Sequence, residues 1–330
     1  MLAKIYTLLV VLLCTISASV FACDYCLLTQ GISPLETARG VGLRVDQRYT
    51  RLATLFDHGE KIGNNGALET HWTTQLTGFY SVTPRFTMTA VVPVVRRFEA
   101  EGVTIIEEGG ALAKRAPGTA RILHSGENGS SFGLGDIALI GRYQFMNRHS
   151  LNSTLVAALQ GGLRVPTGKT DETLADGDFL DAHIQPGSGA FTYFFGLSTS
   201  YAIKRTTVVA NGMFGIPGKG EVGNDTYEFG NFFNYDASFR YRLNGGLQSK
   251  TSFFASLGLA GEYRKPEFQN GLPTEEGTGG HTVYLTPGVQ LFMRSIILEL
   301  SFWQPIVRDL DGEQLGETFK TSGGVTFLLR

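Results

Sequence analysis

The stretch Phe232-Phe233-Asn234-Tyr235-Asp236-Ala237-Ser238-Phe239-Arg240-Tyr241-Arg242-Leu243 alternates apolar and polar residues with a period of two. Successive residues of a β-strand point to opposite faces, so one face would be aromatic and aliphatic and the other charged and polar. The stretch is longer than the roughly five or six residues of most soluble strands, and it is long enough to cross a bilayer. One face therefore suits lipid and the other water, as in a membrane-spanning β-barrel.

Stretches with the same pattern recur from residue 38 to the end of the chain. We predict strands near residues 38–51, 68–81, 86–98, 132–145, 151–165, 190–203, 206–216, 230–243, 249–263, 281–293, 295–306 and 317–329. A single-chain bacterial barrel has an even number of strands, because an odd strand would leave the closing pair parallel. The sequence therefore predicts an all-β fold, a transmembrane antiparallel up-and-down β-barrel of about 12 strands.

The connections between these strands alternate between short and long. The short ones are rich in residues that turn a chain sharply, and they fall at residues 82–85, 146–150, 204–205, 244–246 and 293–294. The long ones are rich in Gly, Asp and Glu, and they fall at residues 56–67, 99–131, 166–189, 217–229, 265–280 and 308–316. Bacterial barrels have short periplasmic turns and long extracellular loops, so we expect both termini in the periplasm. We also expect the loops at 99–131 and 167–189 to fold inward and to set selectivity.

The first residues are typical of a secretory signal peptide. Lys4 supplies the positive start, and Val20-Phe21-Ala22 provides a site for a leader peptidase. We therefore predict three parts, a signal peptide at residues 1–22, a periplasmic segment at 23–37 and a barrel at 38–330. A secreted chain with such a barrel is expected in the outer membrane of a Gram-negative bacterium.

Composition limits the partners. Charged residues make up 18% of the 330 residues and the net charge is −2, whereas a nucleic-acid-binding protein would carry a basic stripe. We expect bilayer lipid and a small-molecule solute as partners, no nucleic acid, and a monomer. The outer-membrane insertion machinery is a further expected partner, because Ser322, Gly324, Phe327 and Leu329 have the spacing of a terminal targeting strand.

The polar face of the strands supplies the candidate lumen-lining residues. They are Arg44, Asp46, Arg48, His71, Arg96, Asp136, Arg142, Arg164, Asp236, Arg240, Arg242, Glu262 and Glu299. In one interpretation these charges pair across the lumen and hold the shape of the barrel. In the other they form a constriction that selects solutes by size and charge.

Cys23-Asp24-Tyr25-Cys26 is a second candidate site. A local disulfide is one interpretation, since the periplasm is oxidising; redox exchange or capture of a soft metal, and lipidation of Cys23, are the others. Leu27 follows the motif where a haem-attachment site has His, and a zinc site would need a second pair of ligands. We therefore predict no metal site and no cofactor.

A barrel enzyme is the third possibility considered. His124, His183 and His281 fall in or beside predicted external loops, and three carboxylates lie just before His183, namely Asp176, Asp178 and Asp181. A hydrolase needs such groups at the outer rim. Acidic, Gly-rich loops are also ordinary solvated connections, so we predict no catalytic residues and no enzyme.

Four strings resemble a known family. They are Phe132-Gly133-Leu134-Gly135-Asp136-Ile137, Arg164-Val165-Pro166-Thr167-Gly168-Lys169, Gln185-Pro186-Gly187-Ser188-Gly189-Ala190-Phe191-Thr192-Tyr193 and Tyr284-Leu285-Thr286-Pro287-Gly288-Val289-Gln290. These strings are similar to those of outer-membrane barrels grouped as the MetA-pathway-of-phenol-degradation family, which are called transporters. The resemblance runs from about residue 40 to the end, and it implies uptake of small organic compounds without supplying catalytic residues.

The expected function is an outer-membrane channel for passive uptake of a small organic solute, with aromatic and hydrophobic compounds as candidates. The alternative is a barrel that anchors a periplasmic redox or metal-handling arm at Cys23 and Cys26. A barrel hydrolase is the third hypothesis. The solute itself does not follow from the sequence.

Overall fold

The computed structural model describes residues 40–64, 66–100, 103–105, 122–125, 128–244, 251–274 and 277–329. The predicted signal peptide, the Cys23 and Cys26 pair and much of the loop at 99–131 lie outside the described residues, as does the side chain of His124. Within the described part, no helix is long and apolar enough to cross a bilayer.

Twelve long strands form one antiparallel wall, which confirms the predicted fold class and strand number. They are β1 (Val41–Asp57), β3 (Leu68–Thr83), β4 (Phe86–Ala100), β8 (Ile137–His149), β9 (Ser153–Val165), β10 (Thr192–Ile203), β11 (Thr206–Pro217), β14 (Phe232–Arg242), β15 (Thr251–Arg264), β18 (Gly280–Met293), β19 (Ile296–Leu310) and β20 (Glu313–Leu329). The shorter strands are β2 (Glu60–Lys61), β5 (Val103–Ile105), β6 (Ile122–Ser125), β7 (Asn128–Leu134), β12 (Lys219–Val222), β13 (Asp225–Glu228), β16 (Phe268–Gln269) and β17 (Leu272–Pro273).

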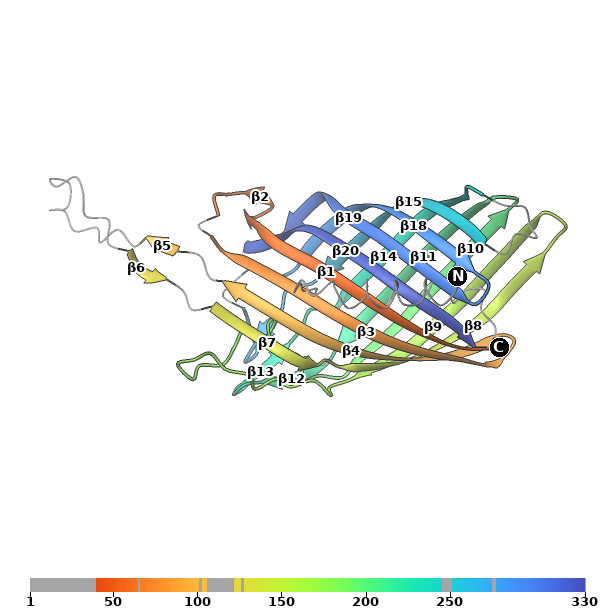
Figure 1. Cartoon of the computed structure of the whole chain (residues 1–330). Helices are drawn as coiled ribbons and strands as arrows, with labels where there is room; N and C mark the ends of the chain where they lie inside the picture. The colour runs from red at the N-terminus through yellow and green to blue at the C-terminus, as the bar shows by residue number, and fades with distance from the viewer. Residues whose placement is uncertain are drawn as a thin grey trace, which may run out of the picture.

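The wall closes between its first strands and its last. β1 pairs with β20 along nearly its whole length, from Val41 opposite Leu329 to Asp57 opposite Glu313. On its other side β1 lies beside β3 (Figure 1), where the Ser81 amide donates to the Gly40 carbonyl at 2.9 Å. Closure leaves no long sheet edge exposed, which is the condition for a β-structure in lipid.

The predicted strand at 132–145 is broken into two pieces. β7 ends at Leu134 and β8 begins at Ile137, with Gly135 and Asp136 between them. β4 pairs with β8 over residues 86–91 and with β7 over residues 94–100. Both pieces run antiparallel to β4, and their register along it differs by one residue, so the fourth strand of the wall is irregular close to its middle.

The short turns gather at one end of the barrel and the longer connections at the other (Figure 1). We call these the turn end and the loop end. At the turn end, β10 and β11 are joined by Lys204 and Arg205, as predicted, and β18 and β19 are joined by Arg294 and Ser295, one residue later than predicted. The chain also finishes at the turn end, because β20 runs toward it.

One predicted long connection, at residues 308–316, is wrong. β19 continues to Leu310 and β20 begins at Glu313, so Asp311 and Gly312 make a tight turn. Gly312 has φ +65°, a left-handed conformation that glycine adopts at little cost. Residues 313–316 form a strand because their backbone groups pair with β1.

Two other loops form a small sheet outside the wall. β12, β13, β16 and β17 pair in that order, joining the 217–229 and 265–280 connections. Asn270 and Gly271 turn the second hairpin with φ of +53° and +80°. This pair of positive angles is what an Asn-Gly hairpin turn provides.

Side chains alternate between the two faces of the wall. On β10, Tyr193, Phe195 and Leu197 are about half exposed and point outward, whereas Thr192 and Phe194 are buried. Large apolar side chains left outside a closed wall have lipid as their expected environment. The alternation seen in the sequence therefore corresponds to a lipid face and a lumen face.

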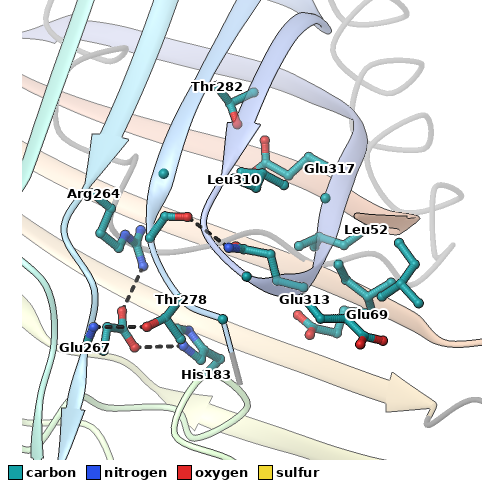
Figure 2. A pocket seen from close by; sticks show the side chains of 18 of the residues that line it. Leu52, Glu69, His183, Arg264, Glu267, Thr278, Thr282, Leu310, Glu313 and Glu317 are labelled. Carbon is teal, nitrogen blue, oxygen red and sulfur yellow. Dashed lines mark hydrogen bonds and ion pairs between the residues drawn. The ribbon is translucent and has the colours of Figure 1, made fainter. Parts of the chain in front are cut away.

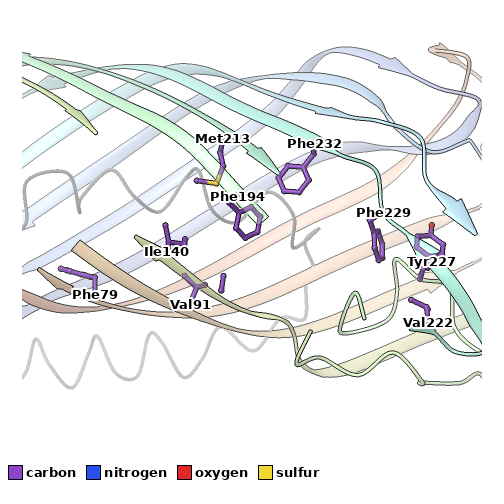
Figure 3. Close-up of a cluster of buried hydrophobic side chains, with 11 residues drawn as sticks. Phe79, Val91, Ile140, Phe194, Met213, Val222, Tyr227, Phe229 and Phe232 are labelled. Atoms are coloured by element: carbon purple, nitrogen blue, oxygen red, sulfur yellow. The ribbon is translucent and has the colours of Figure 1, made fainter. Parts of the chain in front are cut away.

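Part of the lumen face is apolar. Phe79, Ile140, Phe194, Met213 and Phe232 belong to one cluster of buried side chains (Figure 3). The rings of Phe194 and Phe232 lie 6.1 Å apart between centroids, and the Arg164 guanidinium carbon lies 5.2 Å from the Phe194 centroid. The interior therefore has an apolar patch, to which β3, β8, β10, β11 and β14 contribute.

Candidate functional site in the lumen

The lumen also holds two charged clusters, on β1, β15, β18, β19 and β20. In the first, nearer the turn end, the Arg44 guanidinium on β1 donates to Asp46 at 2.7 Å and also to Glu299 on β19. Gln290 on β18 donates to the same Glu299 carboxylate. Arg44 and Asp46 are almost fully buried, so each charge is stabilised by its partner.

The second cluster lies nearer the loop end. The Lys320 ammonium on β20 contacts the carboxylates of Glu262 and Glu317, each at 2.7 Å. It also lies 4.6 Å from the centroid of the Tyr284 ring, whose hydroxyl donates to both carboxylates. The Lys320 cation therefore holds three side chains together, one each from β15, β18 and β20.

The segment at residues 181–185 folds back against the wall. Arg97 on β4 donates to the carbonyl oxygens of His183 and Gln185, and the Ser131 hydroxyl donates to the Ile184 carbonyl. Gln185 is fully buried, and its side chain amide bonds the carbonyls of Glu172 and Leu180 at 2.8 and 3.0 Å. This loop is therefore fixed to the barrel by hydrogen bonds.

Asp136 anchors the two ends of the same loop. Its carboxylate accepts bonds from the Gly168 amide at 3.0 Å, the Ser188 amide at 2.9 Å and the Ser188 hydroxyl at 2.6 Å. The two ends approach closely, since a Cβ on Gly187 would lie 2.4 Å from the Gly168 carbonyl oxygen. Glycine is required there for close approach and not for a left-handed backbone.

An ion pair connects this loop to its neighbours at the loop end of the barrel. His183 Nε2 lies 2.9 Å from the buried Glu267 carboxylate, which also accepts a 2.6 Å bond from the Tyr227 hydroxyl. Desolvation opposes the charge on both groups, but their mutual attraction prevails. The pKa of His183 is raised to about 10, and the pKa of Glu267 is lowered to about 2, with Arg264 at 3.5 Å contributing to the latter.

The stability contributed by this ion pair is expected to depend on pH. The raised pKa of His183 means that its contribution is complete below its ordinary value of 6.5 and is lost as the pH rises toward about 10. The lowered pKa of Glu267 means that its contribution is complete above 4.5 and is lost as the pH falls toward about 2. The ion pair should therefore contribute most to the free energy of unfolding between pH 4.5 and 6.5.

This prediction can be checked by urea unfolding of the wild type and of the variant His183→Gln/Glu267→Gln between pH 5 and 10. The difference in unfolding free energy should be largest near pH 5.5 and should shrink steadily toward pH 10. A difference that stays constant over this range would contradict the ion pair.

Two cavities lie along the lumen. The larger, of about 910 Å³, is at the loop end and is lined by residues that include His183, Glu262, Glu267 and Tyr284 (Figure 2). The smaller, of about 100 Å³, is lined by residues of the first charged cluster and by Trp303. Tyr284 lines the larger cavity and Trp303 the smaller, and their rings pack 5.5 Å apart between centroids. We call this ring pair the junction of the two cavities.

The structure places most of the predicted lumen-lining residues on the lumen face. They are Arg44, Asp46, Arg48, His71, Arg142, Arg164, Asp236, Arg240, Arg242, Glu262 and Glu299. Arg44 and Asp46 meet Glu299, and Asp236 meets Asn211 at 3.0 Å. A role in selectivity stays a prediction for all of them.

Two of the predicted lumen residues are placed differently. Arg96 is exposed on the outward face of β4, opposite Trp72, and its neighbour Arg97 is the buried, inward residue. The alternation of apolar and polar residues does not indicate which of two adjacent arginines faces the lumen. Asp136 is not on a strand face, because it lies between β7 and β8 and holds the loop.

The residues of the barrel-hydrolase hypothesis are not brought together. His183 lines the larger cavity, whereas His281 packs on the outward face, where its Nε2 lies 3.0 Å from the Tyr235 hydroxyl. Asp176 and Asp178 are exposed, and the Asp181 carboxylate accepts from the His183 amide. Among the described residues, no group of three or more His, Cys, Asp and Glu side chains could hold a metal ion.

The closed wall with its lipid face and polar interior defines a transmembrane β-barrel of the outer-membrane class. Residues 61–295 match the family described as "Putative MetA-pathway of phenol degradation". This match spans well over half of the sequence, and the chain belongs to that family, as the resemblance of its motifs predicted.

Several solved structures have a similar fold. An outer-membrane channel of Pseudomonas putida F1 is 14% identical, with a TM-score of 0.63, over 88% of this chain and 96% of that one. The NanC porin is 12% identical, with a TM-score of 0.40, over 87% and 100% of the two chains. The CymD monoaromatic hydrocarbon channel is 9% identical, with a TM-score of 0.40, over 94% and 93%. A comparison with curated proteins gave no match.

Proposed function

We propose that this barrel is a channel through which a small organic solute crosses the outer membrane passively. The observation that carries the proposal is the pair of cavities inside the wall, which follow one another from the loop end toward the turn end. A lumen this narrow, with a loop tied to its wall, suits a selective pore and not a wide general porin.

The lining supports an organic solute. The apolar cluster that includes Phe79, Phe194 and Met213 faces the same interior as the charged clusters around Arg44 and Lys320. A mixed lining of this kind offers apolar contact to a carbon skeleton and polar contact to its substituents.

Two further features belong to the proposal. We place the turn end in the periplasm, because barrels of this class have short periplasmic turns and long extracellular loops. The chain is proposed to act as a monomer. The alternative arm at Cys23 and Cys26 lies outside the described residues, and none of the described contacts favours it over the channel.

The junction of the two cavities provides the test. Reconstituted in liposomes, the wild type should pass small sugars, amino acids and aromatic acids at rates that fall steeply with size. Trp303→Ala should raise the swelling rate several-fold for the larger solutes, because it removes one of the two rings at the junction.

Phe302→Ala is the matched control, because Phe302 is the next residue on β19 and points outward. It removes an aromatic side chain without widening the lumen. Equal swelling with every solute, unaffected by Trp303→Ala, would contradict a selective pore. No swelling with any solute would contradict the channel itself.

A further inference from the structure

The lipid face of β1, β3 and β4 changes character along its length. Near the turn end its outward side chains are apolar, and they include Val45, Leu76 and Met88. The next outward residue after Val45 is the exposed Gln47, whose side chain donates to the Thr74 hydroxyl of β3 at 2.7 Å. The apolar band that suits the hydrocarbon core of a bilayer therefore ends at about this level on these strands.

Aromatic side chains come next along the same face, toward the loop end. Trp72 on β3 is opposite Arg96 on β4, and Arg96 is in turn opposite Phe132 on β7, which is 69% exposed. The ring of Tyr49 on β1 packs edge-on against that of Phe319 on β20, with their centroids 5.1 Å apart. Aromatic residues of membrane proteins gather where the hydrocarbon core meets the headgroups, so we expect lipid headgroups at this level.

Two arginines lie on this part of the lipid face. Arg51 on β1 and Arg96 on β4 are exposed, whereas their neighbours Thr50 and Arg97 are buried on the lumen face. The hydrogen bond between the side chains of β1 and β3 puts Arg51 beside Thr70, so β3 is the strand that separates the two arginines (Figure 1). Two strand spacings amount to about 10 Å.

The charge on this face has one sign. Its outward positions are the alternate residues 41–51 of β1, 70–80 of β3 and 88–98 of β4, and none of these described residues is Asp or Glu. A cation on the lipid face is unfavourable unless it reaches the headgroups. The planar guanidinium group can donate two parallel hydrogen bonds to a phosphate. The face is therefore complementary to a lipid with phosphate in its headgroup.

We propose that Arg51 and Arg96 bind the phosphorylated headgroup of lipid A, the glycolipid anchor of the outer leaflet, whose acyl chains then lie against the apolar band. The proposal goes beyond the proposed function and takes from it the placement of the loop end outside the cell. Lipid A carries phosphates at both ends of a disaccharide, so it offers an anionic group to each arginine. Trp72 lies on β3 between the two and contacts the same lipid.

Trp72 also provides the measurement. The chain has two tryptophans, and Trp303 lines the lumen, so Trp303→Phe leaves Trp72 as the reporter on the lipid face. This full-length protein is reconstituted in vesicles of dibrominated phosphatidylcholine, whose bromine atoms quench a neighbouring tryptophan. Lipid A without bromine should restore the fluorescence at mole fractions at least about tenfold lower than unbrominated phosphatidylcholine does, because each arginine near the membrane surface attracts the anionic headgroup.

Arg51→Gln/Arg96→Gln, added to Trp303→Phe, should abolish this advantage, so that lipid A restores the fluorescence no better than phosphatidylcholine. The matched control is Arg85→Gln/Arg205→Gln, which removes the same charge from exposed positions at the turn end and should keep the advantage. Lipid A stripped of its phosphates should act like phosphatidylcholine with every protein. Because lipid A enters both leaflets of these vesicles, the result does not depend on which end of the barrel faces outward.

Two results would overturn the proposal. One is equal recovery with the phosphorylated and the phosphate-free lipid A, and the other is an advantage for lipid A that survives Arg51→Gln/Arg96→Gln. A thermal unfolding scan shows whether each variant is folded, and the phosphate-free lipid tests the proposal without any change to the arginines. Lipid binding and liposome swelling are separate measurements, so this proposal and the channel can each fail while the other stands.

Discussion

Asp136→Ala is expected to detach the loop at residues 166–189 from the barrel wall. The carboxylate accepts three hydrogen bonds, from the amides of Gly168 and Ser188 and from the Ser188 hydroxyl, and the site is buried. Hydrogen bonds to a charged group contribute about 1.5–3 kcal/mol each, so the loss of three should cost the docked loop at least about 4.5 kcal/mol. The loop would then be docked for only part of the time.

Limited proteolysis followed by mass spectrometry measures this effect. Asp136→Ala should be cleaved within residues 166–189 at least about 100-fold faster than the wild type, while the strands stay intact, because cleavage follows the population of the open loop. Asp178→Ala is the control, since Asp178 is exposed in the same loop. Equal cleavage rates in all three proteins would show that Asp136 does not hold the loop.

Lys320→Met is expected to lower the free energy of unfolding by about 3–5 kcal/mol, the usual cost of removing one partner from a buried ion pair. The ammonium contacts both Glu262 and Glu317 at 2.7 Å, and its side chain is 8% exposed. Without it, two carboxylates from β15 and β20 would face each other with the Tyr284 hydroxyl as their shared donor.

Urea unfolding in lipid vesicles gives the free energy directly. Glu262→Gln/Glu317→Gln added to Lys320→Met should restore most of the loss, because it removes the uncompensated charges. Lys219→Met is the control, since Lys219 pairs with Glu228 on an exposed hairpin and such pairs contribute little. A loss of stability that the added substitutions fail to restore would assign the effect to packing and not to charge.

The wall could be predicted from the sequence because the apolar and polar residues alternate within each strand. In the stretch from Phe232 to Leu243, the predicted lumen residues Asp236, Arg240 and Arg242 do face the interior. A long strand between lipid and water must alternate along its whole length, so the register follows from the residues alone. Pro166 also ends β9 at Val165 as expected, because proline cannot donate to the ladder.

The site was harder to predict because its contacts come from segments far apart in the chain. Glu267 and His183 lie in different loops, and nothing in the spacing of the sequence brings them together. Lys320 was a missed lumen residue, although it alternates with Ser322 and Gly324 on the inward face of β20. The hairpin at Asn270 and Gly271 was also missed, despite a turn signal that the sequence contains.

The break between β7 and β8 gives the two membrane leaflets different walls to contact. Near the turn end, β8 is bonded on both sides, to β4 and β9. Near the loop end, the ladder partner of β7 is β4, and on its inward face the Ser131 hydroxyl donates to the Ile184 carbonyl of the loop. The lipid facing β8 therefore meets a continuous ladder, whereas the lipid facing β7 meets a strand supported by a loop, which makes that side the more compliant part of the circumference.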